Sequence, residues 1–85
     1  MAKIIMYVTA TCPYCHHAER LLANKGIKDI NKIRVDLQPQ LRVEMMEKSG
    51  RRTVPQIYIN ELHIGGFDDL RALDLAGELD PLLAI

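Results

Sequence analysis

Both cysteines of the chain lie in one short stretch, Cys12-Pro13-Tyr14-Cys15-His16. Two thiols separated by two residues can form a structural disulfide, bind a metal ion, attach a haem group or exchange disulfides with other molecules. Each role needs something different from the rest of the chain: a long loop to close, further ligands, an export signal, or a helix that begins at the first thiol. The surrounding sequence therefore has to discriminate between them.

The first three roles find little support. A disulfide between Cys12 and Cys15 would close a very small loop and restrict the unfolded chain little. A structural zinc ion needs about four ligands, and adjacent His16 and His17 point apart, so that at most one of them could join His63 and the thiols. The C-x-x-C-H pattern matches a haem site, but such attachment needs an export route, and the N-terminal residues do not predict a signal peptide. We expect no bound metal ion.

The fourth role, disulfide exchange, requires a strand followed by a helix. Lys3–Val8 is a continuous β-prone run that predicts a buried strand. Proline at position 13 and glycine at position 26 are typical of the two ends of a helix, which we expect from Pro13 to about Lys25. Cys12 is then the N-cap residue of this helix, and Cys15 lies in its first turn.

A cysteine at a helix N-terminus is suited to nucleophilic attack. The unpaired N–H groups and the positive end of the helix dipole stabilise a thiolate and so lower the pKa of a thiol placed there. We expect Pro13 to direct Cys12 outward as an exposed nucleophile, while the sheltered Cys15 lies close enough to attack a mixed disulfide on Cys12. The residues around the pair therefore favour redox chemistry.

The remaining chain predicts two further helices and three further strands. Asn31–Leu37 alternates apolar and charged residues and predicts a half-exposed strand. Pro39 opens a helix, Gln40–Ser49, with Leu41, Met45 and Met46 on its inner side. Gln56–Asn60 and Glu61–Gly66 predict a hairpin. The last elements are a helix starting near Asp68-Asp69, with Leu70, Leu73 and Ala76 facing inward, and a closing helical turn that buries Leu82 and Leu83.

Length and composition limit the class of protein. The 85 residues predict one domain, 1–85, near the lower size for a self-sufficient core. Eleven basic and eleven acidic residues give no net charge, which argues against a nucleic-acid-binding protein. The sequence contains no run of about 18 apolar residues, so it does not predict a membrane span. The N-terminal residues lack a signal-peptide cleavage site, so the cytoplasm is the expected location.

Three motifs together resemble the glutaredoxins, most closely their short bacterial dithiol type: CPYC at 12–15, TVPQIYI at 53–59 and HIGGFDDL at 63–70. The resemblance covers nearly the whole chain. It implies a thioredoxin-like α/β fold, a mixed four-stranded sheet flanked by helices, with the strands in the order second, first, third, fourth. It also implies glutathione as co-substrate, and disulfide-containing or glutathionylated proteins as substrates. We expect a monomer that acts without nucleic acid, membrane or metal.

The resemblance also assigns roles to residues. Cys12 would be the nucleophile that becomes glutathionylated, and Cys15 would resolve the mixed disulfide. A cis peptide bond before Pro55 would leave the Val54 backbone free to pair with the extended ligand. The loop around Gly66 would approach the γ-glutamyl end. The residues implied to bind glutathione are Tyr14, Thr53, Val54, Pro55, Gly66, Phe67 and Asp68, the last through the ligand's ammonium group.

Two positions depart from the family pattern. Many relatives have a lysine three residues before the first cysteine, near the ligand's glycine carboxylate, where this chain has Thr9. We expect weaker glutathione binding, or compensation by Arg51 or Arg52; unchanged affinity in Arg51→Ala and in Arg52→Ala would remove the idea of compensation. Phe67 replaces a residue that is often small or polar, which alters the packing beside the ligand.

Two other functions remain open at this point. A thioredoxin-like disulfide reductase recharged by a flavin reductase would use the same thiols, although the short length and the second and third motifs argue against it. A non-enzymatic iron–sulfur cluster carrier would bridge two protomers through Cys12 and glutathione. Pro13 stiffens the turn and disfavours this carrier.

Overall fold

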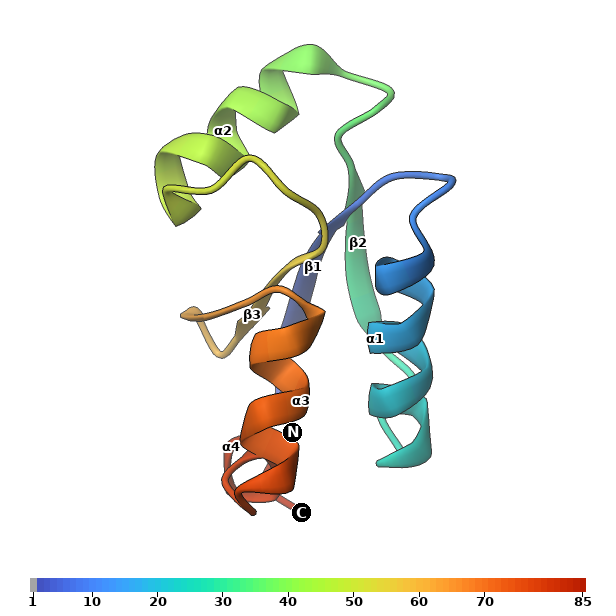
Figure 1. Cartoon of the computed structure of the whole chain (residues 1–85), viewed down its shortest axis with the longest axis vertical. Helices are drawn as coiled ribbons and strands as arrows, with labels where there is room; N and C mark the ends of the chain where they lie inside the picture. The colour runs from blue at the N-terminus through green and yellow to red at the C-terminus, as the bar shows by residue number, and fades with distance from the viewer. Residues whose placement is uncertain (1) are drawn as a thin grey trace.

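The computed structural model describes residues 2–85, which form a four-stranded sheet with helices on both faces (Figure 1). The strand order is β2-β1-β3-β4; β1 and β2 are parallel, and β3 is antiparallel to both β1 and β4. The predicted fold class and strand order are confirmed. The elements are β1 (Ile4–Val8), α1 (Pro13–Asn24), β2 (Ile30–Arg34), α2 (Pro39–Ser49), β3 (Gln56–Ile59), β4 (Leu62–Gly65), α3 (Phe67–Leu75) and α4 (Leu79–Leu83).

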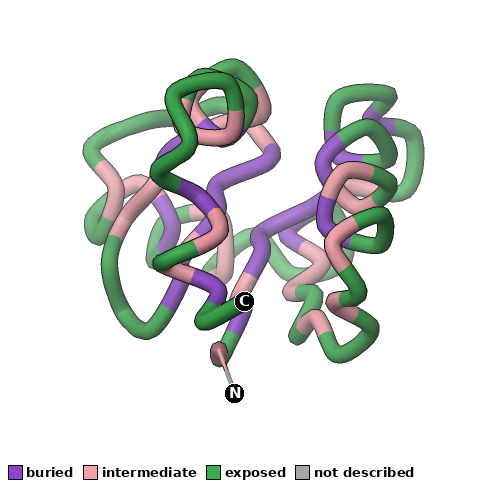
Figure 2. The backbone as a smooth tube through the Cα atoms, turned by 90° about the horizontal axis from the view of Figure 1, so that it is seen from below, coloured by how far each residue is buried: buried purple, intermediate pink, exposed green. Residues whose placement is uncertain are grey.

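The two faces of the sheet bury cores of different size. In Figure 1, α1 and α3 lie in front of the strands, whereas α2 lies near the end of the sheet that contains the C-terminal end of β1. The buried segments, purple in Figure 2, run through the middle of the molecule between exposed turns. The larger core contains Ile4, Met6, Val8, Cys12, Cys15, Ala18, Leu22, Ile57, Ile59, Leu70, Leu79 and Leu83. The smaller core contains Tyr7, Val35 and Met45. Both cysteines therefore belong to the larger core.

The ends of the elements follow the local signals in the sequence. Helices α1 and α2 begin at Pro13 and Pro39, whose missing N–H groups have no partner in a first turn anyway. Gly50 ends α2 in the left-handed conformation, at φ 72°. Asn60 and Glu61 both have positive φ angles and join β3 to β4, as a two-residue hairpin turn requires. Within residues 2–85, no helix is long and apolar enough to cross a membrane.

Two details of the expected elements are wrong. Strand β2 ends at Arg34 rather than Leu37, because the chain turns where the Asp36 carboxylate accepts hydrogen bonds from the Arg34 guanidinium and the Ala10 N–H. Val35 still donates its N–H to the Val8 carbonyl and is buried beneath α2. Ala76, expected on the inner side of the last long helix, is exposed because α3 ends at Leu75.

Candidate active site

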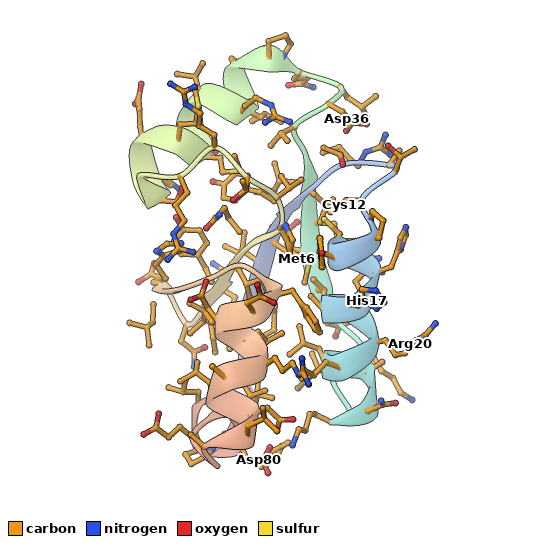
Figure 3. All side chains as sticks on the ribbon, in the orientation of Figure 1. Met6, Cys12, His17, Arg20, Asp36 and Asp80 are labelled. Carbon is orange, nitrogen blue, oxygen red and sulfur yellow. The ribbon has the colours of Figure 1, made fainter. Side chains whose placement is uncertain are left out.

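Cys12 lies where the chain leaves β1 and enters α1 (Figure 3). Its sulfur accepts a hydrogen bond from the Cys15 N–H at 3.2 Å, so the first turn of α1 points a backbone donor at the sulfur, as expected for an N-cap residue. The expected outward projection is wrong: Cys12 is 7% exposed. The reason is the segment before β3, whose Val54 carbonyl lies 3.6 Å from the sulfur and covers it.

Cys15 has a more enclosed environment than Cys12. It is 1% exposed and packs in the larger core. Burial, followed by its hydrogen bond to Cys12, raises the pKa of the Cys15 thiol to about 12. At neutral pH this thiol is therefore protonated, and its solvent access is closed while both cysteines are reduced.

A groove of about 250 Å³ lies beside the Cys12 sulfur. Val54 lines this groove, and its carbonyl also covers the sulfur. Its lining residues are Tyr14, Arg51, Thr53, Val54, Pro55, Gly66, Phe67, Asp68 and Asp69. All the residues that the resemblance implied for glutathione are thus brought together around one groove, while their roles remain predictions. A larger hollow of about 420 Å³ lies at the opposite end of β1, between Lys3 and the segment 28–31.

The Val54 backbone crosses the middle of the site. The Val54–Pro55 peptide bond is cis, as the resemblance implied. The Val54 carbonyl contacts the Cys12 sulfur, and within residues 2–85 no acceptor pairs with the Val54 N–H. This segment therefore offers the groove one unpaired backbone donor next to the Cys12 sulfur.

The N-terminus of α3 forms the other wall of the groove. Gly66 is the N-cap residue, and its N–H donates to the Asp69 carboxylate at 2.9 Å. The same carboxylate pairs with the Arg51 guanidinium at 2.7 Å. A side chain on Gly65 would collide with the Asp69 carboxylate, so that glycine leaves room for the cap. Asp68, the preceding residue, lines the groove.

The sequence interpretation placed Asp69 near a helix start but not in the groove, and it left the role of Arg51 undecided. An acidic residue three positions after an N-cap is a recognised signal for a helix start, and this spacing could have identified Asp69. Arg51 lines the groove, whereas Arg52 is exposed and does not line it. The bond from Arg51, followed by the bond from the Gly66 N–H, lowers the pKa of Asp69.

Three rings gather at the outer edge of the groove. Phe67 stacks near Tyr14, with ring centroids 6.5 Å apart, and His17 lies 5.6 Å from Phe67. Tyr14 is 60% exposed. The sequence interpretation placed His17 on a solvated helix face, and the structure shows that its exposed ring also contacts Phe67. Phe67 thus packs between α1 and the groove.

Among residues 2–85, no three or more His, Cys, Asp or Glu side chains group closely enough to hold a metal ion.

Comparisons with known proteins agree on one family. Residues 4–64 match the family model described as Glutaredoxin. The chain is 51% identical over 84 residues to Glutaredoxin of Pseudomonas aeruginosa, covering 99% of both chains. It is 52% identical over 83 residues to Glutaredoxin 3 of Escherichia coli K12, covering 98% of this chain and 99% of that one.

Solved structures give the same result. Glutaredoxin from Brucella melitensis superposes with a TM-score of 0.84 at 51% identity, covering 98% of this chain and 89% of that one. A buckwheat glutaredoxin–glutathione complex superposes with a TM-score of 0.90 at 26% identity, covering 98% of this chain and 77% of that one.

Proposed function

Because this chain belongs to the glutaredoxin family of thiol oxidoreductases, we propose that it uses glutathione to reduce protein disulfides and protein–glutathione mixed disulfides. One observation carries the proposal: Val54 both contacts the Cys12 sulfur and lines a groove to which it offers an unpaired backbone N–H. The similar buckwheat protein has been solved in complex with glutathione, which supports the choice of ligand.

Glutathione fits the chemistry of the groove as an extended peptide with its cysteine sulfur at Cys12. Its cysteinyl unit would pair with the Val54 backbone in the manner of an added strand. Its γ-glutamyl carboxylate would lie at the N-terminus of α3, where helix N–H groups favour an anion. Its ammonium group would donate to the Asp68 carboxylate, which lines that wall.

The first reaction would be attack by the Cys12 thiolate on the glutathione sulfur of a mixed disulfide. A Cys12–glutathione disulfide forms, the bond to the substrate protein breaks, and that protein leaves as a thiolate that takes up a proton. The Cys15 N–H, 3.2 Å from the Cys12 sulfur, stabilises the attacking thiolate. A second glutathione thiolate then attacks the glutathione sulfur on Cys12, which releases oxidised glutathione and restores the Cys12 thiolate.

Protein disulfides would need Cys15 as well. After Cys12 has formed a mixed disulfide with the substrate, the Cys15 sulfur attacks the Cys12 sulfur, the substrate sulfur leaves, and the proton of Cys15 ends on the leaving thiol. Burial raises the pKa of Cys15, and so do its hydrogen bond to Cys12 and the negative charge on Cys12. The contribution of that charge disappears once Cys12 is in the mixed disulfide, so deprotonation of Cys15 becomes easier at the step that needs it. Two glutathione molecules then reduce the Cys12–Cys15 disulfide.

The test uses a glutathione-coupled assay with two substrates: a peptide with one glutathionylated cysteine and a protein with one disulfide. We expect Cys12→Ser to lose both activities, and Cys15→Ser to retain the first and lose the second. Turnover of either substrate by Cys12→Ser would refute the proposal. Wild-type turnover that required a flavin reductase in place of glutathione would assign the chain to the thioredoxin-like alternative.

A further inference from the structure

Gln56 is a fully buried polar residue directly behind the groove. Among residues 2–85 it is the polar side chain with 0% exposure. Burying an amide is costly unless its donors and acceptor are bonded, and here both ends are. The Gln56 Nε2 donates to the Thr53 carbonyl at 2.9 Å and lies 3.3 Å from the Thr53 hydroxyl, and Oε1 lies 2.8 Å from His63 Nε2.

The hydrogen bond from Gln56 to Thr53 determines which group donates and which accepts at the contact between Gln56 and His63. Because the Gln56 nitrogen faces the Thr53 carbonyl, its oxygen faces His63 and must accept, so the proton of the neutral His63 ring lies on Nε2. His63 is opposite Tyr58 in the β3–β4 pairing and packs on the Tyr58 ring at 5.0 Å. The contacts thus run from β4 through β3 to the segment that lines the groove.

The bond to Thr53 has a consequence for Val54. The Thr53 C=O and the Val54 N–H belong to one trans peptide group, in which the two bonds point in opposite directions. A carbonyl held towards Gln56 therefore directs the Val54 N–H away from Gln56. This N–H is the donor that no acceptor within residues 2–85 occupies.

We propose that Gln56 and His63 are positioning residues that aim the Val54 N–H at the ligand in the groove: Gln56 holds the Thr53 carbonyl, and His63 holds the Gln56 amide. The proposal rests on the proposed function, since glutathione is taken as the ligand. Neither side chain lines the groove, so both act through the backbone at 53 and 54. A donor that is aimed before binding lowers the ordering cost of the complex.

The main test variant is Gln56→Met, which keeps a long unbranched side chain and removes both hydrogen-bonding ends. With a peptide carrying one glutathionylated cysteine as probe, we expect KM to rise about fivefold to tenfold, the loss expected for one hydrogen bond. We expect kcat to stay within about twofold, because Cys12 and its bond from the Cys15 N–H are unchanged. In the free protein, the ¹⁵N order parameter of the Val54 amide should fall.

Control variants separate positioning from stability. Gln40→Met makes the same change at an exposed residue whose amide bonds to Gln38, and Leu83→Ala weakens the core under α4; both should leave KM unchanged. His63→Leu should raise KM in wild type but not in Gln56→Met. His63→Gln, which retains an N–H donor, should restore KM, and this pair keeps the test valid if Gln56→Met fails to fold.

The outcomes are distinct. A wild-type KM in Gln56→Met, a raised KM without a change at the Val54 amide, or an equal rise in Leu83→Ala would each overturn the positioning role. Absence of glutathione-coupled turnover in the wild-type protein would overturn the proposed function instead. In that case the order parameter of the Val54 amide still tests whether Gln56 orients the segment.

Discussion

The two cysteine sulfurs differ in what surrounds them, although only two residues separate them in the sequence. The Cys12 sulfur accepts a backbone N–H and lies beside the groove. The Cys15 sulfur is enclosed by the core, and burial raises the pKa of its thiol to about 12. Because both side chains have low exposure, we expect the two thiols to differ in reactivity through their hydrogen bonds and positions more than through their exposed areas.

This difference predicts selective alkylation. When the reduced protein reacts briefly with iodoacetamide between pH 7 and pH 9, we expect one adduct on Cys12 and none on Cys15, because Cys15 remains protonated and enclosed. Mass spectrometry after proteolysis locates the adduct. The denatured protein should take two adducts and folded Cys12→Ser none; rapid labelling of Cys15 in the folded protein would contradict the assignment of roles.

At the scale of elements, the segment between α2 and β3 is held from several sides. Ser49 at the end of α2 exchanges hydrogen bonds with the Arg51 backbone, and Arg42 donates to the Arg52 carbonyl. Asp69 of α3 binds the Arg51 side chain, and Gln56 of β3 binds Thr53. The groove is therefore formed by an irregular segment that neighbouring regular elements fix in place.

Asp69 predicts a pH-dependent contribution to stability. Asp69→Ala removes the acceptor for the Gly66 N–H and the partner of Arg51, and we expect a loss of about 1 kcal/mol at pH 7, since a solvent-exposed ion pair adds little. Because folding lowers the pKa of Asp69, this contribution is present above the ordinary aspartate range near pH 4 and is lost as the pH falls below it.

Urea unfolding of wild type and Asp69→Ala from pH 7 to pH 3 measures this effect. The difference between the two proteins should shrink as the pH drops below about 4. Asp68→Ala is the control, because its carboxylate is in the same helical turn and makes neither bond. A difference that is constant over the whole range would show that the Asp69 carboxylate charge contributes nothing.

At the scale of the molecule, the candidate active site is attached to the larger core. Cys12 caps α1 and Cys15 lies in its first turn, and the same helix buries Ala18 and Leu22 against the sheet. The smaller core under α2 is closed by the Tyr7 hydroxyl, which donates to the Glu44 carboxylate at 2.9 Å. Packing of α1 therefore determines where the Cys12 sulfur lies relative to Val54.

Leu22→Ala tests how far stability depends on this packing. Leu22 is fully buried, and such truncations cost about 2–5 kcal/mol through lost burial and the remaining cavity. This is a large part of the roughly 5–15 kcal/mol that stabilises a typical domain. Urea unfolding measures the loss. Leu75→Ala, at an exposed position of α3, should change stability little; equal losses in both variants would contradict the described core.

The order of the elements and the position of Cys12 at a helix start could be predicted from the sequence. Apolar periodicity, proline and glycine determine local structure through a few neighbouring residues. The resemblance also named the groove residues around 53–55 and 66–68. The inward burial of Cys12, the pairing of Asp69 with Arg51 and the contact of Gln56 with His63 could not be predicted from the sequence. Each depends on segments distant in sequence: the Val54 segment against α1, Arg51 against α3, and the register that places His63 opposite Tyr58. Local chemistry determined which residues could react, and tertiary packing decided which backbone groups face them, because contacts with neighbouring elements set the direction of the peptide groups in the irregular segment at 53–54.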